Sequence, residues 1–464
     1  MRVLLIRPNS TIKGVPMPIG LGYLSTALKK HGHKVSILDS RLLRLSLDQT
    51  IERGYAFEPN AVGLSVLNFD APQAHFLAKR IKQKWPGIPV IMGGPYVSAN
   101  AETILADDSV DILVPGEGEE TLPELIDALD KGRSIDDVRG LIYKKDNKPV
   151  HTDRRPVTDD LDSYQIDWEA LNPSAYFSFW KRTAQNTTQL SSRIAQIFTS
   201  RGCPFGCIFC HNIFGRKFRA RSPENVIAEM EFLVGKYGIR EFEISDDSFN
   251  LDMNRAKTIS RLIMEHALKI KLSFPNGLRA DCIDEELLSL LRKAGTYRIT
   301  YAVESASPRI QKLIGKALNL ERTKETISIT AARGIVTTGF FMLGFPGETA
   351  EEMRMTMDYA VNSDLHIASF FYLCPFPGTP LAESYPELAN QVRHQHIEDY
   401  SKITINLSAV SNQVLHSICK RAYRRFYFQP RRILRTLKVV PKNIRTLVSI
   451  VDILRLSLRD AVNY

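Results

Sequence analysis

The alternation of short apolar strands with amphipathic helices constrains this chain most, because it occurs in two separate series. The strand-like runs of the first series are RVLLIR, KVSIL, AVGLSV, PVIM and DILV, between residues 2 and 114. Helical patterns cover residues 20–31 and 72–85 between them. This rhythm predicts a doubly wound, parallel α/β sheet, a fold that binds ligands at the carboxyl ends of its strands.

The second series starts at Ala195 and contains six strand-like runs: AQIFTS, EFEIS, KLSFPN, YRITYAVE, VTTGFFMLG and IASFFYL. Six βα units predict a partial (β/α)6 barrel with its chemistry at the carboxyl ends of the strands. Polar sequence without a sustained period separates the two series and predicts a linker. We therefore expect an α/β domain over 1–135, a linker over 136–192, a partial barrel over 193–385 and a basic helical C-terminal region over 386–464.

The net charge of the chain, +10, is concentrated at its carboxyl end. Residues 419–464 hold twelve Lys/Arg against two Asp/Glu, so the preceding 418 residues are formally neutral. A neutral body offers no extended basic groove, and nucleic acid is therefore not an expected partner. The start, MRVLLIRPNS, lacks the features of a signal peptide, and no apolar run reaches about 18 residues, so we expect a cytoplasmic protein.

Three of the six cysteines lie within eight residues, at positions 203, 207 and 210, directly after the first strand of the second series. Three thiolates in a loop can bind three irons of an iron–sulfur cube and leave the fourth iron open to a substrate or cofactor. A structural zinc ion normally has four ligands, and His211 is badly placed to be the fourth because it adjoins Cys210. The spacing favours a cluster, with zinc as the alternative.

The CxxxCxxC spacing, the aromatic residue before its last cysteine and the six βα units resemble the radical S-adenosylmethionine (SAM) enzymes, over about Ile194 to Glu383. The resemblance implies that Cys203, Cys207 and Cys210 hold a [4Fe–4S] cluster. It also implies that the open iron binds the amino and carboxylate groups of SAM. One electron then cleaves SAM to methionine and a 5′-deoxyadenosyl radical.

The same resemblance suggests residues that bind SAM. Phe209 occupies the position that packs near the adenine, and Arg279 is placed to hold the methionine carboxylate. Asp246 and Asp247 end the second strand, where many members carry Gly-Gly-Glu for the methionine amine, and the choice between the two is open. Glu304 ends the fourth strand and is expected to accept hydrogen bonds from the ribose hydroxyls. Ordinary core packing, helix capping and salt bridges are the alternatives, and no catalytic side chain is assigned.

Small residues end several strands of the first series, in GLSVL, GGPY and PGEGE, and leave a broad shelf there. Neither a GxGxxG segment after the first strand nor a phosphate loop is present, which disfavours a nucleotide. Residues from Met1 to about Leu125 resemble the cobalamin-binding domain of one radical SAM subgroup. Because Asp-x-His-x-x-Gly is absent, the resemblance implies cobalamin bound without a protein histidine, along Ser65, Gly93 and Gly94. A degenerate domain without cofactor is the alternative.

In the basic C-terminal region, arginines alternate with aromatic and aliphatic residues. An apolar side could be formed by Tyr423, Phe426, Tyr427, Ile433, Leu434 and Leu437. Three interpretations stay open: contact with an anionic membrane surface, RNA binding, or a helix packed on the barrel with a solvated basic face. The first would make the protein peripheral to the membrane.

Together these patterns predict a cobalamin-dependent radical SAM enzyme that resembles the class B radical methyltransferases and oxidative cyclases. We expect it to methylate an unactivated carbon of a hydrophobic or secondary metabolite, such as a lipid or isoprenoid. Its expected electron donor is a flavodoxin or ferredoxin. The alternatives are a radical cyclase or rearrangement enzyme without methyl transfer, a tRNA methylthiotransferase-like enzyme, and a non-catalytic zinc- or cobalamin-binding protein.

Overall fold

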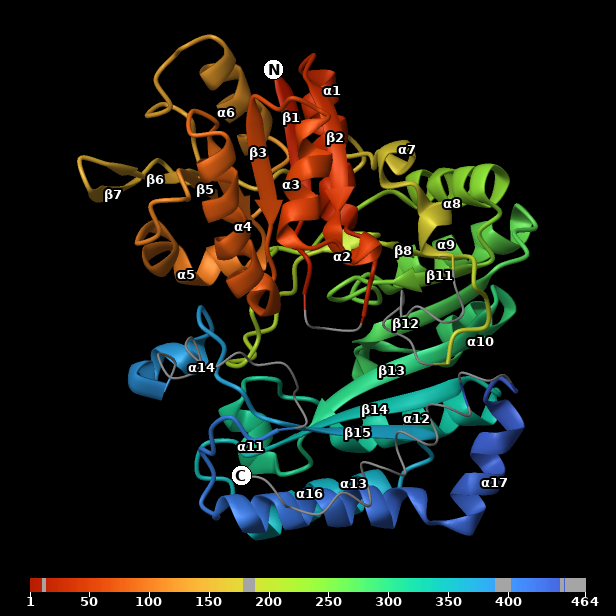
Figure 1. The fold of residues 1–464 in the computed structure, drawn as a ribbon. Helices are drawn as coiled ribbons and strands as arrows, with labels where there is room; N and C mark the ends of the chain where they lie inside the picture. The colour runs from red at the N-terminus through yellow and green to blue at the C-terminus, as the bar shows by residue number, and fades with distance from the viewer. Residues whose placement is uncertain (11–13, 178–187, 389–401, 443–445, 447–464) are drawn as a thin grey trace. The chain divides into compact units, whose positions relative to one another are not determined.

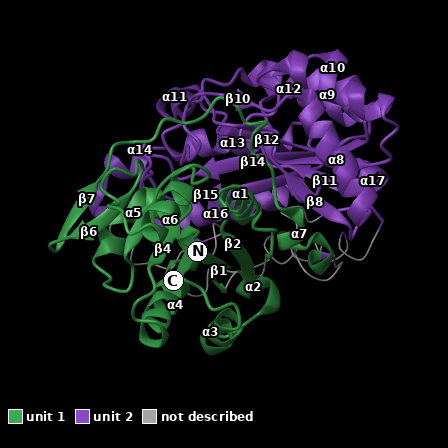
Figure 2. Cartoon of the chain, turned by 90° about the horizontal axis from the view of Figure 1, so that it is seen from above, with its two compact units in different colours: residues 1–176, 181–183 green, residues 177–180, 184–464 purple. Residues whose placement is uncertain are grey.

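The computed structural model describes residues 1–10, 14–177, 188–388, 402–442 and 446. The chain divides into two compact units (Figures 1 and 2). Residues 1–176 lie in the first unit, and the described residues from 188 onward lie in the second. The first five strands of the first unit and the six-stranded sheet of the second unit are parallel, as the two βα series predict, and an antiparallel hairpin extends the first sheet.

The first unit contains a seven-stranded sheet with the strand order β2-β1-β3-β4-β5-β6-β7. Its strands are β1 (Arg2–Arg7), β2 (Lys34–Asp39), β3 (Ala61–Ser65), β4 (Val90–Gly93), β5 (Ile112–Val114), β6 (Ile142–Lys145) and β7 (Lys148–His151). The strands β1 to β5 are parallel. Because the chain passes to β2 on one side of β1 and to β3 on the other, the carboxyl ends of β1 and β3 form the switch point where such sheets bind ligands.

Helices cover both faces of this sheet (Figure 1). They are α1 (Ile19–Lys30), α2 (Ser40–Leu43), α3 (Leu47–Tyr55), α4 (Ala71–Lys84), α5 (Pro95–Leu105) and α6 (Thr121–Asp130), with the short helices η1 (Asn68–Asp70), α7 (Trp168–Leu171) and η2 (Pro173–Tyr176). Along β1, Leu4 belongs to the core cluster that contains Leu77 of α4. The next residue, Leu5, belongs to the opposite cluster with Leu21 of α1. Burial on both faces explains why the strands read as continuous apolar runs.

Part of the segment expected to be a linker is structured. The strands β6 and β7 form an antiparallel hairpin that extends the first sheet beyond β5. Asp146 and Asn147 both have positive φ, 50° and 58°, as a two-residue hairpin turn requires. Further along, α7 lies so close to α1 that a Cβ on Gly22 would be 2.7 Å from Leu171 Cδ1. These contacts join residues up to 176 to the first unit.

The second unit is an open, six-stranded parallel sheet in sequence order, which is the partial barrel that the second series predicts. Its strands are β8 (Ile194–Ile197), β11 (Glu241–Ile244), β12 (Lys271–Leu278), β13 (Thr296–Glu304), β14 (Val336–Leu343) and β15 (Ile367–Tyr372), and β9 (Ser200–Arg201) pairs separately with β10 (Arg219–Ala220). The helices are α8 (Pro223–Tyr237), α9 (Met253–Glu265), η3 (Ala280–Cys282), α10 (Glu285–Lys293), α11 (Pro308–Leu313), α12 (Leu320–Ala332), α13 (Ala350–Val361), α14 (Pro380–Glu383), α16 (Asn412–Tyr427) and α17 (Pro430–Val439).

The helix α16 packs against α13 and against β15, the edge strand of the partial barrel (Figure 1). The Tyr427 hydroxyl donates to the Ala368 carbonyl at 2.8 Å and accepts from its N–H at 3.1 Å. Tyr423 makes the same pair of contacts with Phe370, at 3.3 and 3.1 Å. Two tyrosine hydroxyls therefore satisfy edge groups that a further strand would otherwise pair.

The predicted apolar side of the C-terminal region is split between two directions. Phe426 is fully buried, and the Arg432 guanidinium stacks on its ring at 3.7 Å. In contrast, Ile433, Leu434 and Leu437 are 44%, 63% and 49% exposed. The aromatic residues Tyr423, Phe426 and Tyr427 thus agree with the interpretation of a helix packed on the barrel. Residues 447–464 lie outside the described part of the chain. Among the described residues, no helix combines the length and apolarity that a membrane crossing requires.

Candidate functional site

The cysteine loop starts at the end of β9 and is supported on two sides. Gly202 has φ +87°, and a Cβ there would lie 2.2 Å from the Lys217 carbonyl oxygen, so only glycine fits. The next residue, Cys203, donates its N–H to the Gly215 carbonyl at 3.1 Å. On the other side, the Ile208 N–H donates to the Ile314 carbonyl at 3.1 Å. The loop therefore has a defined path without being helical.

Cys203 and Cys210 line a cavity of about 380 Å³ inside the second unit. The other residues that line it are Asn212, Asp247, Pro275, Asn276, Arg298 and Phe340. They come from the cysteine loop and from β12, β13, β14 and the segment after β11. The cavity thus combines thiols with one acidic and one basic side chain, inside the partial barrel where chemistry is expected.

The cysteine triplet fits an iron–sulfur cluster. Burial raises the pKa of the Cys207 thiol, the Lys316 charge opposes this, and the negative charges of Cys210, Glu304 and Cys203 raise the pKa further. Cys203 and Cys210 line the same cavity, and Cys207 lies between them in the loop. Among the described residues, no three His, Cys, Asp or Glu side chains group tightly enough to hold a single metal ion. A cubane cluster needs no such group, because each cysteine binds a different iron.

The two aspartates after β11 differ in burial and in the groups that they contact. Asp246 is 2% exposed. Its carboxylate accepts from the Thr199 N–H at 2.6 Å, the Thr199 hydroxyl at 2.5 Å and the Ser200 hydroxyl at 2.7 Å. Burial raises its pKa. Asp247 is exposed, lines the cavity and accepts from the Gly202 N–H at 3.2 Å. Asp246 thus positions the chain before the cysteines, whereas Asp247 faces the cavity.

Arg279 reaches the cysteine loop, but its guanidinium is already engaged. It forms a bidentate pair with Asp281, with Nε and Nη2 at 2.8 and 3.0 Å from the two carboxylate oxygens. It also stacks on the Phe205 ring at 3.8 Å and donates to the Lys316 carbonyl at 3.1 Å. Arg279 therefore supports the cysteine loop, whereas the resemblance implies that it holds the methionine carboxylate of SAM.

Glu304 forms a buried ion pair with Lys316 at 2.9 Å, close to Cys207. Its φ of +67° lies in the left-handed region, where strain often marks a functional position. The neighbouring Gly315 approaches the cysteine loop closely, since a Cβ there would lie 2.8 Å from the Gly206 carbonyl oxygen. Sequence reasoning missed Lys316, because nothing in the chain near it marks its proximity to Cys207.

Phe209 packs as a core residue. Its ring lies 6.1 Å from that of Phe345, and it contacts the buried cluster that contains Ile310 and Leu381. Phe345 belongs to the turn Gly344–Gly347, which Glu348 holds by accepting from the Gly344 and Phe345 N–H groups at 2.7 and 3.1 Å. Burial raises the pKa of Glu348 to about 7.

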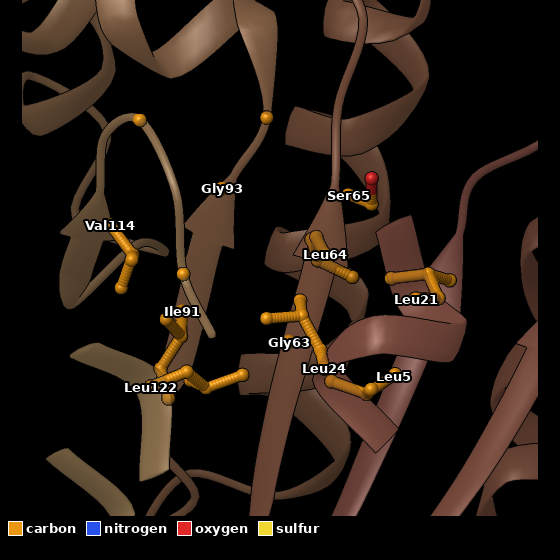
Figure 3. Close-up of a pocket in the computed structure, with 13 residues that line it drawn as sticks. Leu5, Leu21, Leu24, Gly63, Leu64, Ser65, Ile91, Gly93, Val114 and Leu122 are labelled. Carbon is orange, nitrogen blue, oxygen red and sulfur yellow. The ribbon is translucent and has the colours of Figure 1, made fainter. Parts of the chain in front are cut away.

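A second, smaller pocket of about 70 Å³ lies within the first unit (Figure 3). It is lined by Leu5, Leu21, Leu24, Gly63, Leu64, Ser65, Ile91, Gly93, Gly94, Val114, Gly116, Gly118 and Leu122. The nearest atom to a Cβ on Gly93 would be the Val114 carbonyl oxygen, 3.4 Å away, and Gly94 has φ +97°. Glycines thus keep a slot open between the sheet and the leucines of α1 and α6, and this apolar slot fits an uncharged part of cobalamin.

Two family models match these units separately. The radical SAM superfamily model matches residues 197–360, and the B12 binding domain model matches residues 8–126. The first range contains the cysteine loop, and the second contains every residue that lines the glycine-rich pocket except Leu5. The fold and the two sites therefore define an enzyme with two cofactor-binding units.

Similar proteins cover between 82% and 94% of this chain. An uncharacterized methyltransferase of Pyrococcus horikoshii is 32% identical over 94% of this chain and 95% of its own. Cytidylyl-2-hydroxyethylphosphonate methyltransferase of Streptomyces wedmorensis is 32% identical over 82% and 80%. The structure of the radical SAM methyltransferase TsrM from Kitasatospora setae, with tryptophan and a SAM analogue bound, shares the fold with a TM-score of 0.71, 24% identity and coverage of 84% and 76%.

The chain belongs to the cobalamin-dependent radical SAM methyltransferase family. It is an enzyme, and its cofactors are a [4Fe–4S] cluster, SAM and cobalamin. This assignment confirms the cofactors and reaction class expected from the sequence, and it replaces the zinc and non-catalytic alternatives.

Proposed function

We propose that this enzyme methylates an unactivated carbon of a small hydrophobic metabolite inside the second unit. The observation that carries the proposal is the cavity that Cys203 and Cys210 share with Asp247 and Phe340. When bound, the cluster supplies the electron that cleaves SAM, and cobalamin supplies the methyl group. In this proposal residues 1–135 bind cobalamin and 193–385 form the radical domain. The expected linker over 136–192 extends the first unit as far as residue 176, and 386–464 is proposed to support the radical domain.

The proposed roles of the chain's own residues follow from their contacts. Cys203, Cys207 and Cys210 hold the cluster, and Asp247 binds the SAM amino group, since its carboxylate faces the cavity. Glu304 is proposed to contact the ribose. The roles of Arg279 at the methionine carboxylate and of Phe209 near the adenine stay predictions from the resemblance, because Arg279 is paired with Asp281 and Phe209 packs in the core cluster.

In the first unit, we propose that Ser65, Gly93 and Gly94 line the path of the cobalamin tail, since all three line the apolar slot. The leucines of α1 and α6 would exclude water from that tail. No histidine ligand to cobalt is included in the proposal.

The test is anaerobic reconstitution followed by iron, sulfide and cobalt analysis and a SAM cleavage assay. We expect about four irons and one cobalt for each chain, and 5′-deoxyadenosine after reduction with dithionite. Flavodoxin or ferredoxin is then added in place of dithionite, since we propose one of them as the physiological donor. Failure to bind cobalt or to form 5′-deoxyadenosine would contradict the proposal. Candidate lipids and isoprenoids are screened afterwards for methylated product.

The exposed apolar residues of α17 support a second part of the proposal, peripheral contact with an anionic membrane. Ile433, Leu434 and Leu437 are exposed on a helix that also carries Arg431 and Lys438. Exposed apolar residues flanked by basic ones suit an anionic lipid surface.

The membrane contact is tested by sedimentation with vesicles of phosphatidylserine and phosphatidylcholine. Leu434→Asp is expected to reduce binding about tenfold, because it places a negative charge in the apolar patch. Val414→Asp, at an exposed position of α16, is the matched control and is expected to bind like the natural chain. Equal binding of all three proteins, or none by the natural chain, would contradict membrane contact.

A further inference from the structure

The segment after β11 runs beside the chain that leads into the cysteine loop and contacts it at successive points. Asp246 accepts from Thr199 and Ser200, as described above. The next residue, Asp247, accepts from the Gly202 N–H at 3.2 Å. The third residue, Ser248, donates its hydroxyl to Cys203 Sγ at 3.4 Å. Three consecutive side chains therefore follow the approach to the first cysteine, and the last of them contacts its sulfur.

The surroundings of Ser248 hold its hydroxyl close to this sulfur. Ser248 is 6% exposed. Cys203 is held from the other side by the hydrogen bond of its N–H to the Gly215 carbonyl, at 3.1 Å. Just beyond Ser248, the Asn250 amide donates to the Arg279 and Cys282 carbonyls at 2.8 and 3.0 Å. The segment is thus fixed at both ends, and Ser248 has little freedom to turn away.

We propose that Ser248 is a positioning residue that keeps its hydrogen bond to Cys203 when this cysteine ligates the cluster, and thereby raises the cluster's reduction potential. The proposal rests on the function proposed above, in which Cys203, Cys207 and Cys210 hold the cluster. Reduction adds one negative charge to the cluster and its thiolate ligands. A donor at a ligand sulfur stabilises that added charge, so hydrogen bonds to sulfur make a cluster easier to reduce.

The experiment is a potentiometric titration of the reconstituted full-length enzyme, followed by electron paramagnetic resonance. Ser248→Ala removes the donor without filling new space. In this variant we expect the equilibrium constant for one-electron reduction of the cluster to fall about tenfold. This corresponds to a reduction potential that is about 59 mV more negative. Ser248→Thr keeps a hydroxyl and is expected to retain most of the natural potential.

Ser245→Ala is the matched control. Ser245 is a buried serine of the same segment, and no hydrogen bond to a cysteine is present at its hydroxyl. We expect its cluster potential to equal that of the natural enzyme. A potential in Ser248→Ala equal to that of Ser245→Ala would overturn the proposal, and so would a Ser248→Thr potential equal to that of Ser248→Ala.

A second readout detects the hydrogen bond itself and not its effect on the potential. Electron–nuclear double resonance of the reduced cluster, compared in H2O and D2O, is expected to show an exchangeable proton that is missing in Ser248→Ala. A natural enzyme without such a proton would overturn the proposal while leaving the cluster assignment intact. Absence of any reducible cluster in the natural enzyme would instead overturn the function on which the proposal rests.

Discussion

The two units use the same βα architecture to build two chemically opposite pockets. The slot of the first unit is lined by glycines and aliphatic side chains and contains one polar side chain, Ser65. The cavity of the second unit is lined by Cys203, Cys210, Asp247 and Arg298. A slot without charges selects its ligand by shape and exclusion of water, whereas thiols and charges select by coordination and pairing. The comparison shows that the fold determines where a ligand binds, whereas the residues at the strand ends determine which kind of ligand binds there.

The largest expected effect is the loss of cluster binding in the second unit without loss of cobalamin binding in the first. Cys207→Ala removes one of three cluster ligands, so we expect most of the iron and sulfide to be lost while cobalt binding is retained. Cys282→Ala is the control, because Cys282 lies in η3, outside the loop. Metal analysis after anaerobic reconstitution checks the prediction. Simultaneous loss of cobalt would show that the two sites do not load independently.

The converse change breaks the first site alone. In Gly93→Leu the new side chain enters the slot without backbone strain, so we expect cobalamin affinity to fall by about tenfold or more with iron content unchanged. The control is Gly87→Leu, which places the same side chain at an exposed glycine whose added Cβ would have no neighbour within 4 Å. Spectroscopic titration with cobalamin measures both affinities. Equal affinities would mean that the slot does not contact the cofactor.

A pH-dependent difference is expected from Glu348, a fully buried carboxyl group of the second unit. Folding raises the pKa of Glu348 from 4.5 to about 7. Between these values the folded chain binds a proton that the unfolded chain does not, so the free energy of unfolding falls as the pH rises. The loss amounts to about 3 kcal/mol.

Glu348→Gln keeps an acceptor for the two N–H groups and does not titrate, so we expect it to lack this pH dependence. Urea unfolding of both proteins at pH 5 and pH 8 is the measurement. If the natural chain and the variant lose the same stability between these pH values, Glu348 is not the group responsible.

A smaller effect separates the two aspartates of the second site. Asp247→Asn removes the charge that we propose to bind the SAM amino group, and we expect SAM affinity to fall about tenfold with iron content intact. Asp246→Asn disturbs three hydrogen bonds before the cysteines, and we expect it to reduce iron loading instead. Calorimetric titration with SAM and iron analysis are made on both variants. The reverse pattern would exchange their roles.

The smallest effect concerns the sheet edges. The first sheet continues beyond β5 into the β6–β7 hairpin, whereas β15 is closed by tyrosine hydroxyls. Tyr427→Phe leaves the Ala368 N–H and C=O without that hydroxyl, and we expect a loss of about 1 kcal/mol in the free energy of unfolding. Tyr385→Phe, in the same unit, is the control. Thermal unfolding that is identical for both variants would mean that the edge contact adds no stability.

Much of the fold was predictable because its signals are local. The run Arg2–Arg7 has the same bounds in the sequence pattern and in the structure, and the helical patterns over 20–31 and 72–85 correspond to α1 and α4, each displaced by one residue. The hairpin β6–β7 was missed because its strands are short and largely polar. Its signal was the Asp146-Asn147 pair, two residues that tolerate positive φ in a two-residue turn.

The site was predictable only in part. A sequence motif identifies residues that are close along the chain, but it does not identify residues that become close only when the chain folds. The cysteine spacing alone predicts a cluster loop. The contacts of Ser248 with Cys203, and of Lys316 with Glu304, join residues 45 and 12 positions apart. Likewise, Asp246 and Asp247 are chemically identical neighbours, and their burial alone separates their roles.

The sequence by itself determined the two parallel βα units, the cysteine triplet and the glycine-rich strand ends, because periodicity and spacing are properties of the local chain. Only the tertiary structure decided that Asp247 faces the cavity, that Arg279 is committed to Asp281, and that Tyr427 seals the edge of β15. Each of these depends on which side chains lose water and which partners they meet, and both are settled when distant segments pack together.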